Sequence, residues 1–206
     1  MKFLRMDRLA AANVQSEPYD YFIVEHFLDQ DAITAVNATF PQIGGGGSYP
    51  VDDLTEAHVV RDVIAELDSQ EFQDAIAQKL GIDLAGRPKM YSLRGHTRAK
   101  DGRIHTDSED KLITVLLYLN EGWAHSEGRL RILRNGQDLE DYAAEVSPAG
   151  GTLLVFRRSD KSWHGHPPYV GQRRALQMNW LKTDQQRRFH QFRHQVSTAL
   201  KRAFAG

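Results

Sequence analysis

The sequence predicts a single domain that is mainly β, an antiparallel sandwich or barrel with flanking α-helices. Three observations lead to this prediction. The length of 206 residues suits one ordinary domain. Apolar spacing typical of helices is confined to the N-terminal half and the C-terminal end. Between them, residues 89–182 form a series of short β-type segments separated by Gly, Pro, Asn and Asp, without intervening helices.

The N-terminal half predicts one strand and two or three helices. Residues Tyr19–Phe27 alternate and are rich in aromatic and β-branched types, as a strand would be. Asp29 is a typical N-cap for the helix that follows. Gly44–Gly47 predicts a flexible loop, either a lid or an inert connection. From about 56 to 80 the apolar spacing fits one or two amphipathic helices, with a break near Asp68–Ser69.

The rest of the chain predicts the β core and a last helix. The predicted strands are residues 89–95, 111–120, 129–134, 151–156 and 173–181. Residues 183–204 have helical spacing, and their many Arg, Lys and Gln side chains fit a solvated face better than a nucleic-acid site.

Composition excludes several classes of protein. Apolar residues make up 41%, charged residues 26%, and the formal net charge is −1, so no overall charge favours nucleic acid or a membrane surface as partner. With no cysteine, disulfides, thiolate metal sites and a cysteine nucleophile are excluded. No segment approaches the roughly 20 apolar residues of a membrane span, and the N-terminus lacks a secretory signal. We expect a cytoplasmic protein; its oligomeric state is not predicted.

Candidate metal ligands lie inside the β region. His105 and Asp107 are two residues apart, so in an extended segment both side chains point to the same side. His164 lies in a distant strand and would complete the set. Two histidines and one carboxylate form the facial triad of non-heme Fe(II) oxygenases, which leaves three coordination positions open. An H-x-D pair alone is weak evidence, because chance produces it often.

A candidate anion-binding arginine follows. Arg173 opens an apolar, alternating strand, and a guanidinium pairs bidentately with a carboxylate. Arg174 is the alternative, and His166 is the alternative to His164 as ligand. The alternation along the strand favours Arg173. Its side carries small and polar residues suited to a cavity lining, namely Ala175, Gln177 and Asn179. The side of Arg174 is apolar, with Leu176, Met178 and Trp180.

These motifs together resemble a known family. The order is the H-x-D of His105 and Asp107, the strand ITVLLYLNEGW, an L-x-I/L element, GTLLVF, and H-x(8)-R from His164 to Arg173. In order and spacing they are similar to the 2-oxoglutarate-dependent dioxygenases of the prolyl 4-hydroxylase type, especially small bacterial members. The resemblance covers roughly residues 87–181, with weaker similarity in the segment YFIVEHFLDQDAI.

The resemblance implies a fold and a division of the chain. The fold would be a double-stranded β-helix, a cupin-like jelly-roll with the metal between two sheets. Residues 1–206 would form a single dioxygenase domain, in which 18–85 supply an N-terminal strand and supporting helices, 87–182 the jelly-roll catalytic core and 183–206 a C-terminal helix.

The resemblance also implies roles for residues. Fe(II) would be held by His105, Asp107 and His164, which would be the catalytic centre. 2-Oxoglutarate would be held by Arg173 and Tyr118, and molecular oxygen would take the remaining metal position. Two departures from relatives stand out: Glu127-Gly128-Arg129 replaces a common Gly-Gly pair, and Tyr91 and Arg94 lie where relatives place a polar cosubstrate or substrate contact, without a clear assignment here.

The implied activity is hydroxylation, and the substrate is the least determined part. We expect a small-molecule, glycan or lipid substrate, which could be related to the cell envelope; peptidyl proline is the alternative. From another class of function, a non-catalytic cupin-like protein could bind a metal or a carboxylate without turnover. The cosubstrate arginine separates these hypotheses, because a cupin that binds only metal would not need it. A glycan-binding β-sandwich would bind no iron in a ligand-dependent way.

Overall fold

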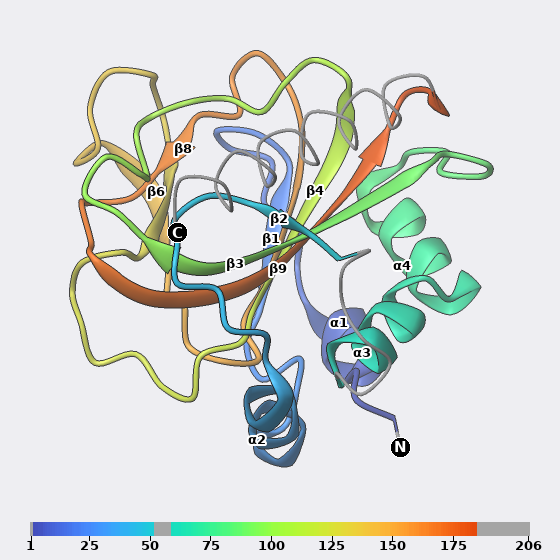
Figure 1. The fold of residues 1–206 in the computed structure, drawn as a ribbon. Coiled ribbons are helices and arrows are strands. Elements are labelled where there is room, and N and C mark those ends of the chain that lie inside the picture. The colour runs from blue at the N-terminus through green and yellow to red at the C-terminus, as the bar shows by residue number, and fades with distance from the viewer. Residues whose placement is uncertain (1, 52–58, 185–206) are drawn as a thin grey trace.

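The computed structural model describes residues 2–51 and 59–184, and two antiparallel sheets confirm the mainly β prediction (Figure 1). The larger sheet has the order β1-β7-β4-β9-β3-β2, and the smaller one has the order β6-β5-β8. The bounds are β1 (Tyr21–Val24), β2 (Tyr49–Pro50), β3 (Lys89–Thr97), β4 (Lys111–Tyr118), β5 (Leu130–Leu133), β6 (Tyr142–Val146), β7 (Leu153–Arg157), β8 (His164–Gly165) and β9 (Gly171–Leu181).

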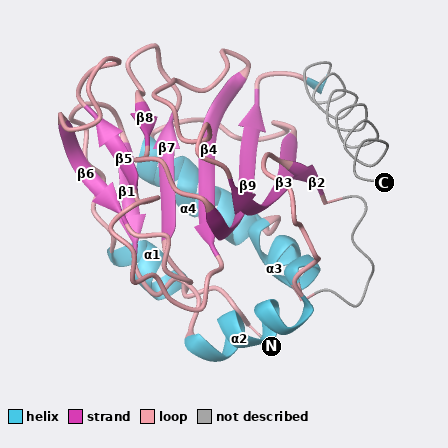
Figure 2. Ribbon diagram, turned by 60° about the vertical axis from the view of Figure 1, so that its left-hand side comes forward, coloured by secondary structure: helices cyan, strands magenta, loops and turns pink. Residues whose placement is uncertain are grey.

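Four helices are described, and they lie against the large sheet (Figure 2). They are α1 (Met6–Ala11), α2 (Gln30–Thr39), α3 (Val60–Leu67) and α4 (Gln70–Leu80). None of the helices within 2–51 and 59–184 has the length and apolar character needed to cross a bilayer. The predicted C-terminal helix falls almost wholly on residues 185–206, outside the described residues, as do residues 52–58 before α3.

Helix boundaries are set by local capping residues, of which Asp29 was predicted as a cap. The Asp29 carboxylate accepts a hydrogen bond from the Ala32 N–H at 3.0 Å and starts α2. The Ser69 hydroxyl accepts from the Phe72 N–H at 3.2 Å and starts α4, so the predicted break at Asp68–Ser69 is confirmed. Gly81 ends α4 in the left-handed conformation, with φ 58°.

The glycine loop lies against β3. Gly46 is buried and forms an isolated bridge with His96, and a β-carbon on Gly46 would collide with the side chains of Arg98 and Asp101. Glycine at 46 is therefore required by a close approach of two segments. This packing favours the connecting role over that of a lid.

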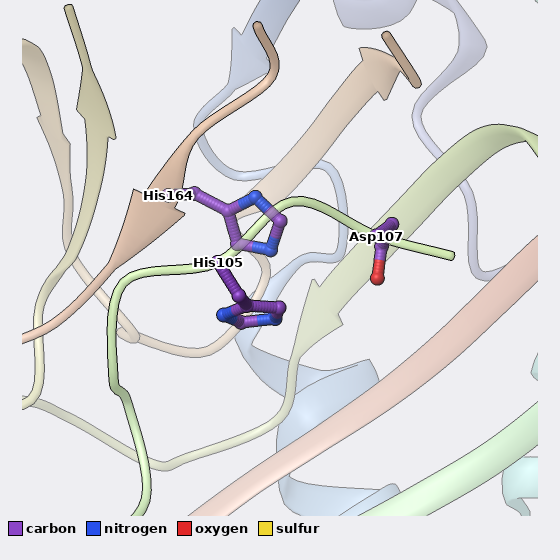
Figure 3. A group of neighbouring side chains, drawn as sticks. All are labelled: His105, Asp107 and His164. Carbon is purple, nitrogen blue, oxygen red and sulfur yellow. The ribbon is translucent and has the colours of Figure 1, made fainter. Parts of the chain in front are cut away.

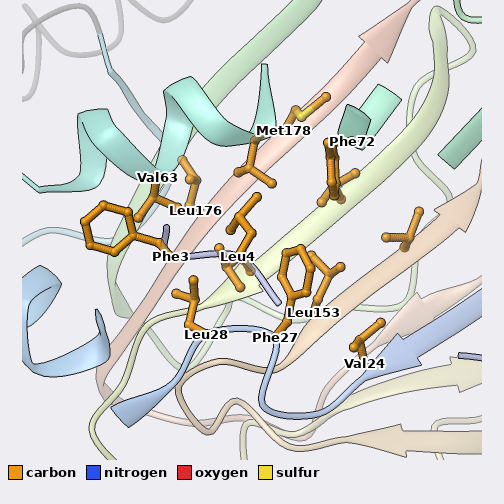
Figure 4. Packing of buried hydrophobic residues seen from close by; sticks show 14 of the residues in the cluster. Phe3, Leu4, Val24, Phe27, Leu28, Val63, Phe72, Leu153, Leu176 and Met178 are labelled. Atoms are coloured by element: carbon orange, nitrogen blue, oxygen red, sulfur yellow. The ribbon is translucent and has the colours of Figure 1, made fainter. Parts of the chain in front are cut away.

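Two cores lie on opposite faces of the large sheet. The helices cover one face, where residues such as Phe27, Phe72 and Met178 pack together (Figure 4). The other face meets the small sheet around a smaller apolar cluster that includes Tyr118 and Phe156. Strands β4 and β9 contribute to both, so they are buried on both faces and alternate residues enter different layers.

A core variant should separate the stability of the fold from the site between the sheets. The Phe72 ring lies 6.2 Å from the Trp180 ring and 6.1 Å from the Phe27 ring, and it is fully buried. We expect Phe72→Ala to lower the free energy of unfolding by about 3–5 kcal/mol, because a large aromatic leaves a cavity. Urea unfolding measures this loss. Gln78→Ala, exposed on the same helix, is the control; equal stability of the two variants would contradict the packing.

Candidate metal centre

Three candidate ligands meet between the two sheets. His105 and Asp107 lie on the loop that joins β3 to β4, and His164 begins β8 (Figure 3). The His105 N–H donates to the His164 carbonyl and the His164 N–H donates to the His105 carbonyl, both at 3.0 Å, so the loop extends the small sheet. One nitrogen or oxygen atom from each of the three side chains lies within 4.8 Å of the others.

Backbone carbonyls orient both imidazoles. The Nδ1 atom of His105 lies 2.8 Å from the Arg103 carbonyl oxygen, and Nδ1 of His164 lies 2.9 Å from the Ser162 carbonyl oxygen. A carbonyl only accepts, so each Nδ1 carries the proton. Each Nε2 then carries no proton and offers a lone pair, which is the form in which histidine binds a metal.

Asp107 is held by polar side chains of the large sheet. Lys111 Nζ donates to Asp107 Oδ1 at 2.8 Å, and the Thr114 hydroxyl donates to Oδ2 at 2.5 Å. Asn179 of β9 donates in turn to the Thr114 hydroxyl oxygen at 2.8 Å. The paired register of Thr114 and Asn179 brings these groups together. Two contacts therefore fix the carboxylate, and a third fixes the hydroxyl that supports it.

The charges of the site suit a divalent cation. Burial alone would raise the pKa of Asp107, but the Lys111 ammonium and the hydrogen bonds outweigh it and hold this pKa well below its usual range. Burial lowers the pKa of His164 to about 4, although Asp107 acts in the opposite direction. Near neutral pH the donor set therefore contains an ionised carboxylate and a neutral buried imidazole. Two imidazoles and one carboxylate fit the facial site of Fe(II).

A cavity of about 80 Å³ adjoins the three residues. Its lining combines apolar and polar side chains from both sheets. The lining residues are Arg94, Gly102, His105, Asp107, Thr114, Leu116, Leu130, His164, Gly165, His166, Arg173, Ala175 and Gln177. A larger hollow of about 690 Å³, lined by residues that include Asn37, Trp123 and Arg174, contains none of the three candidate ligands.

Arg173 is buried and lines the small cavity. Its Nε donates to the Gly128 carbonyl at 2.8 Å, and its Nη2 donates to the Tyr118 hydroxyl at 3.1 Å. The guanidinium carbon also lies 5.0 Å from the centre of the Tyr118 ring. Among the described residues, no carboxylate pairs with Arg173. A buried guanidinium without an acidic partner can bind an anionic ligand that enters the cavity.

Neither alternative raised by the sequence takes the predicted role. Arg174 points away from the cavity, donates to the Asn37 side-chain oxygen of α2 and lies 4.8 Å from the Phe40 ring centre. His166 lines the cavity but lies outside the group of three candidate ligands. Its Nδ1 is 2.8 Å from the Pro167 carbonyl oxygen, and burial lowers its pKa to about 4.

Gly128 contacts Arg173 through its backbone, a contact that the motif Glu127-Gly128-Arg129 alone did not predict. Its φ is +72°, and a β-carbon there would lie 2.9 Å from the Trp123 ring and 3.1 Å from Tyr169. Only glycine fits this conformation and space. The Gly128 carbonyl thereby reaches Arg173, so the glycine retained within Glu127-Gly128-Arg129 helps to position this arginine.

The comparisons with known proteins agree with this architecture. Residues 91–182 match the family model described as the 2OG-Fe(II) oxygenase superfamily. No curated protein matches the sequence. Among solved structures, a Pseudomonas putida prolyl-4-hydroxylase is 23% identical with a TM-score of 0.59, and the alignment covers 86% of this chain and 96% of that one.

Two further solved structures share the fold. A viral collagen prolyl hydroxylase from Paramecium Bursaria Chlorella virus-1, in a 2OG complex, is 15% identical over 79% of this chain and 96% of its own, with a TM-score of 0.55. An oxidoreductase of the 2OG-Fe(II) oxygenase family from Burkholderia pseudomallei is 13% identical over 89% and 96%, with a TM-score of 0.56. The structural similarity establishes the double-stranded β-helix fold alone, and it leaves the substrate open.

Proposed function

Residues 91–182 place this chain in the 2OG-Fe(II) oxygenase superfamily, and from this premise we propose that it is a hydroxylase of a small-molecule, glycan or lipid substrate. As a member of this superfamily with a candidate His-Asp-His metal site, the protein is an Fe(II)- and 2-oxoglutarate-dependent oxygenase. The observation that carries the proposal is that three candidate metal ligands and a buried arginine lie around one cavity, and that this arginine has no carboxylate partner among the described residues. Peptidyl proline is the alternative substrate.

In this proposal, Nε2 of His105, a carboxylate oxygen of Asp107 and Nε2 of His164 hold Fe(II). Lys111 and Thr114 keep the carboxylate ionised and oriented. The three residues line the cavity, so cosubstrate and oxygen would reach a metal held by them from this cavity. Bound Fe(II) supplies the oxidation of 2-oxoglutarate by oxygen to succinate and carbon dioxide, coupled to insertion of one oxygen atom into a substrate C–H bond.

Arg173 and Tyr118 would hold the distal carboxylate of 2-oxoglutarate. Hydrogen bonds to Gly128 and Tyr118 already fix the guanidinium, so little side-chain entropy is lost on binding. The buried site strengthens the pairing of opposite charges and excludes water. This arginine also favours an oxygenase over a cupin that binds only metal, since such a cupin has no need for it.

Thr114→Val should weaken Fe(II) binding while the fold stays intact. The substitution keeps the side-chain shape but removes the hydroxyl that donates to Asp107 and accepts from Asn179. Loss of a group that orients a ligand typically lowers metal affinity about 10–100-fold. Anaerobic titration with Fe(II) measures the effect, and circular dichroism checks the fold. An unchanged affinity would show that Asp107 is oriented without Thr114.

The substrate proposal is tested by release of succinate from 2-oxoglutarate, Fe(II) and oxygen in the presence of pooled compounds. We expect a basal release of succinate without added compounds, and a faster release with one pool of small molecules, oligosaccharides or lipids. Stimulation by proline-containing peptides alone would assign the alternative substrate. Tight Fe(II) binding without succinate in any pool would instead support a cupin-like binding protein.

A further inference from the structure

A second arginine faces the same cavity and has no role in the proposal above. Arg94 lies on β3 opposite Ala175 of β9, and Ala175 lies in turn opposite Tyr118 of β4. Cross-strand partners share a face of a sheet, so the three residues form a row on one face, and Arg94 and Ala175 of this row line the cavity. The small Ala175 side chain separates the two larger ones and leaves space between them.

Arg94 makes no hydrogen bond or ion pair with any described residue, although it is more than half buried. The nearby carboxylates have other partners. Asp101 accepts two side-chain hydrogen bonds from Arg98, at 3.0 and 3.2 Å, and Asp107 is paired with Lys111. Burial and the Arg173 charge both lower the pKa of Arg94, so the surroundings of Arg94 disfavour its positive charge. An arginine nevertheless remains protonated in proteins.

Two guanidinium groups thus line one small cavity without an acidic partner for either among the described residues. Like charges in a partly desolvated space repel, and an anion bound there relieves the repulsion. Under the proposed function, the distal carboxylate of 2-oxoglutarate occupies Arg173 and its keto-acid end lies at the metal. Neither end is then left for Arg94.

We propose that Arg94 recognises the substrate, and that the substrate carries a carboxylate which Arg94 binds beside the metal centre. This inference rests on the proposed function and narrows its substrate class to acids. It excludes neutral glycans and uncharged peptide segments as preferred substrates. An acidic metabolite, a uronic acid or a peptide ending in a free carboxylate would each satisfy it.

Direct binding tests the inference without turnover. The protein is loaded with Mn(II) and saturating N-oxalylglycine, which occupies the cosubstrate position and does not react, and is titrated calorimetrically with glutarate or its neutral diamide. We expect glutarate to bind and the diamide not to bind. Arg94→Gln should weaken glutarate binding about tenfold or more, as loss of a charged hydrogen bond does, with Arg94→Lys intermediate. Lys100→Gln, which removes an exposed positive charge from the neighbouring loop, is the matched control.

A second titration separates the two sources of carboxylate. Anaerobic formation of the visible charge-transfer band of Fe(II) with 2-oxoglutarate reports cosubstrate affinity. We expect Arg94→Gln to leave this affinity within about twofold of the wild-type value, a difference below 0.5 kcal/mol. A loss as large as that in Arg173→Gln would assign Arg94 to the cosubstrate and overturn the inference. The inference would also be overturned if wild type and Arg94→Gln bound glutarate equally, or if the wild type did not bind glutarate in the millimolar range. Absence of the band in the wild type would instead count against the proposed function.

Discussion

Replacing Asp107 with alanine is expected to abolish iron-dependent succinate formation. Asp107 supplies the only carboxylate among the three candidate ligands, and its negative charge offsets part of the charge of Fe(II). Without it, two imidazoles remain and the metal is held weakly. The Lys111 ammonium, 2.8 Å from the carboxylate in the wild type, would then face the metal position and repel the cation. The loss of a ligand and the repulsion by Lys111 both weaken metal binding.

The matched control for this variant is Glu109→Ala. Glu109 lies on the same loop two residues away and is exposed, so its removal changes the charge by the same amount without touching the site. Succinate release and bound iron are measured in both variants, with circular dichroism to check folding. Retained turnover in Asp107→Ala would contradict the assignment of the metal centre. Loss of turnover in Glu109→Ala would point to a general effect of charge.

Arg173→Gln is expected to weaken 2-oxoglutarate binding by about two orders of magnitude, because truncating one partner of a buried charge pair costs about 2–5 kcal/mol. The glutamine can still reach a hydrogen-bond acceptor but carries no charge. Arg173→Lys should recover part of the affinity, since it restores the charge without the planar fork. The anaerobic charge-transfer band gives the dissociation constant in each case.

Arg174→Gln is the control on the same strand. Arg174 contacts Asn37 and Phe40 of the helical layer, so its loss should lower the free energy of unfolding by about 1 kcal/mol and leave cosubstrate affinity unchanged. An effect on 2-oxoglutarate binding equal to that of Arg173→Gln would contradict the separation of the two arginines onto opposite faces of β9.

The sequence predicted those parts of the site that depend on local alternation. His105 and Asp107 share a side because an extended segment has a period of two, and the same rule separated Arg173 from Arg174. The long strands β3, β4 and β9 were found because each has enough residues to show a pattern. Strands β2 and β8 were missed, because two residues do not establish a period, and the short helix α1 was also missed.

Other parts of the site depend on register, which one strand alone does not reveal. Thr114 supports Asp107 only because β4 and β9 pair Thr114 with Asn179. Arg94 enters the cavity because β3 pairs it with Ala175 on the neighbouring strand. The contribution of Gly128 depends on a positive φ and on two aromatic rings packed beside it. Such relations between distant segments appear only when the sheet is assembled.

The most direct test of the account is anaerobic titration of metal-free protein with Fe(II) in the presence of 2-oxoglutarate. We expect the visible charge-transfer band to saturate at one equivalent of Fe(II) in the wild type. The band should be lost in His105→Ala, Asp107→Ala and His164→Ala but kept in His166→Ala, because His166 lies outside the group of candidate ligands. A wild-type protein without the band, or a band that survives in all three ligand variants, would contradict the account.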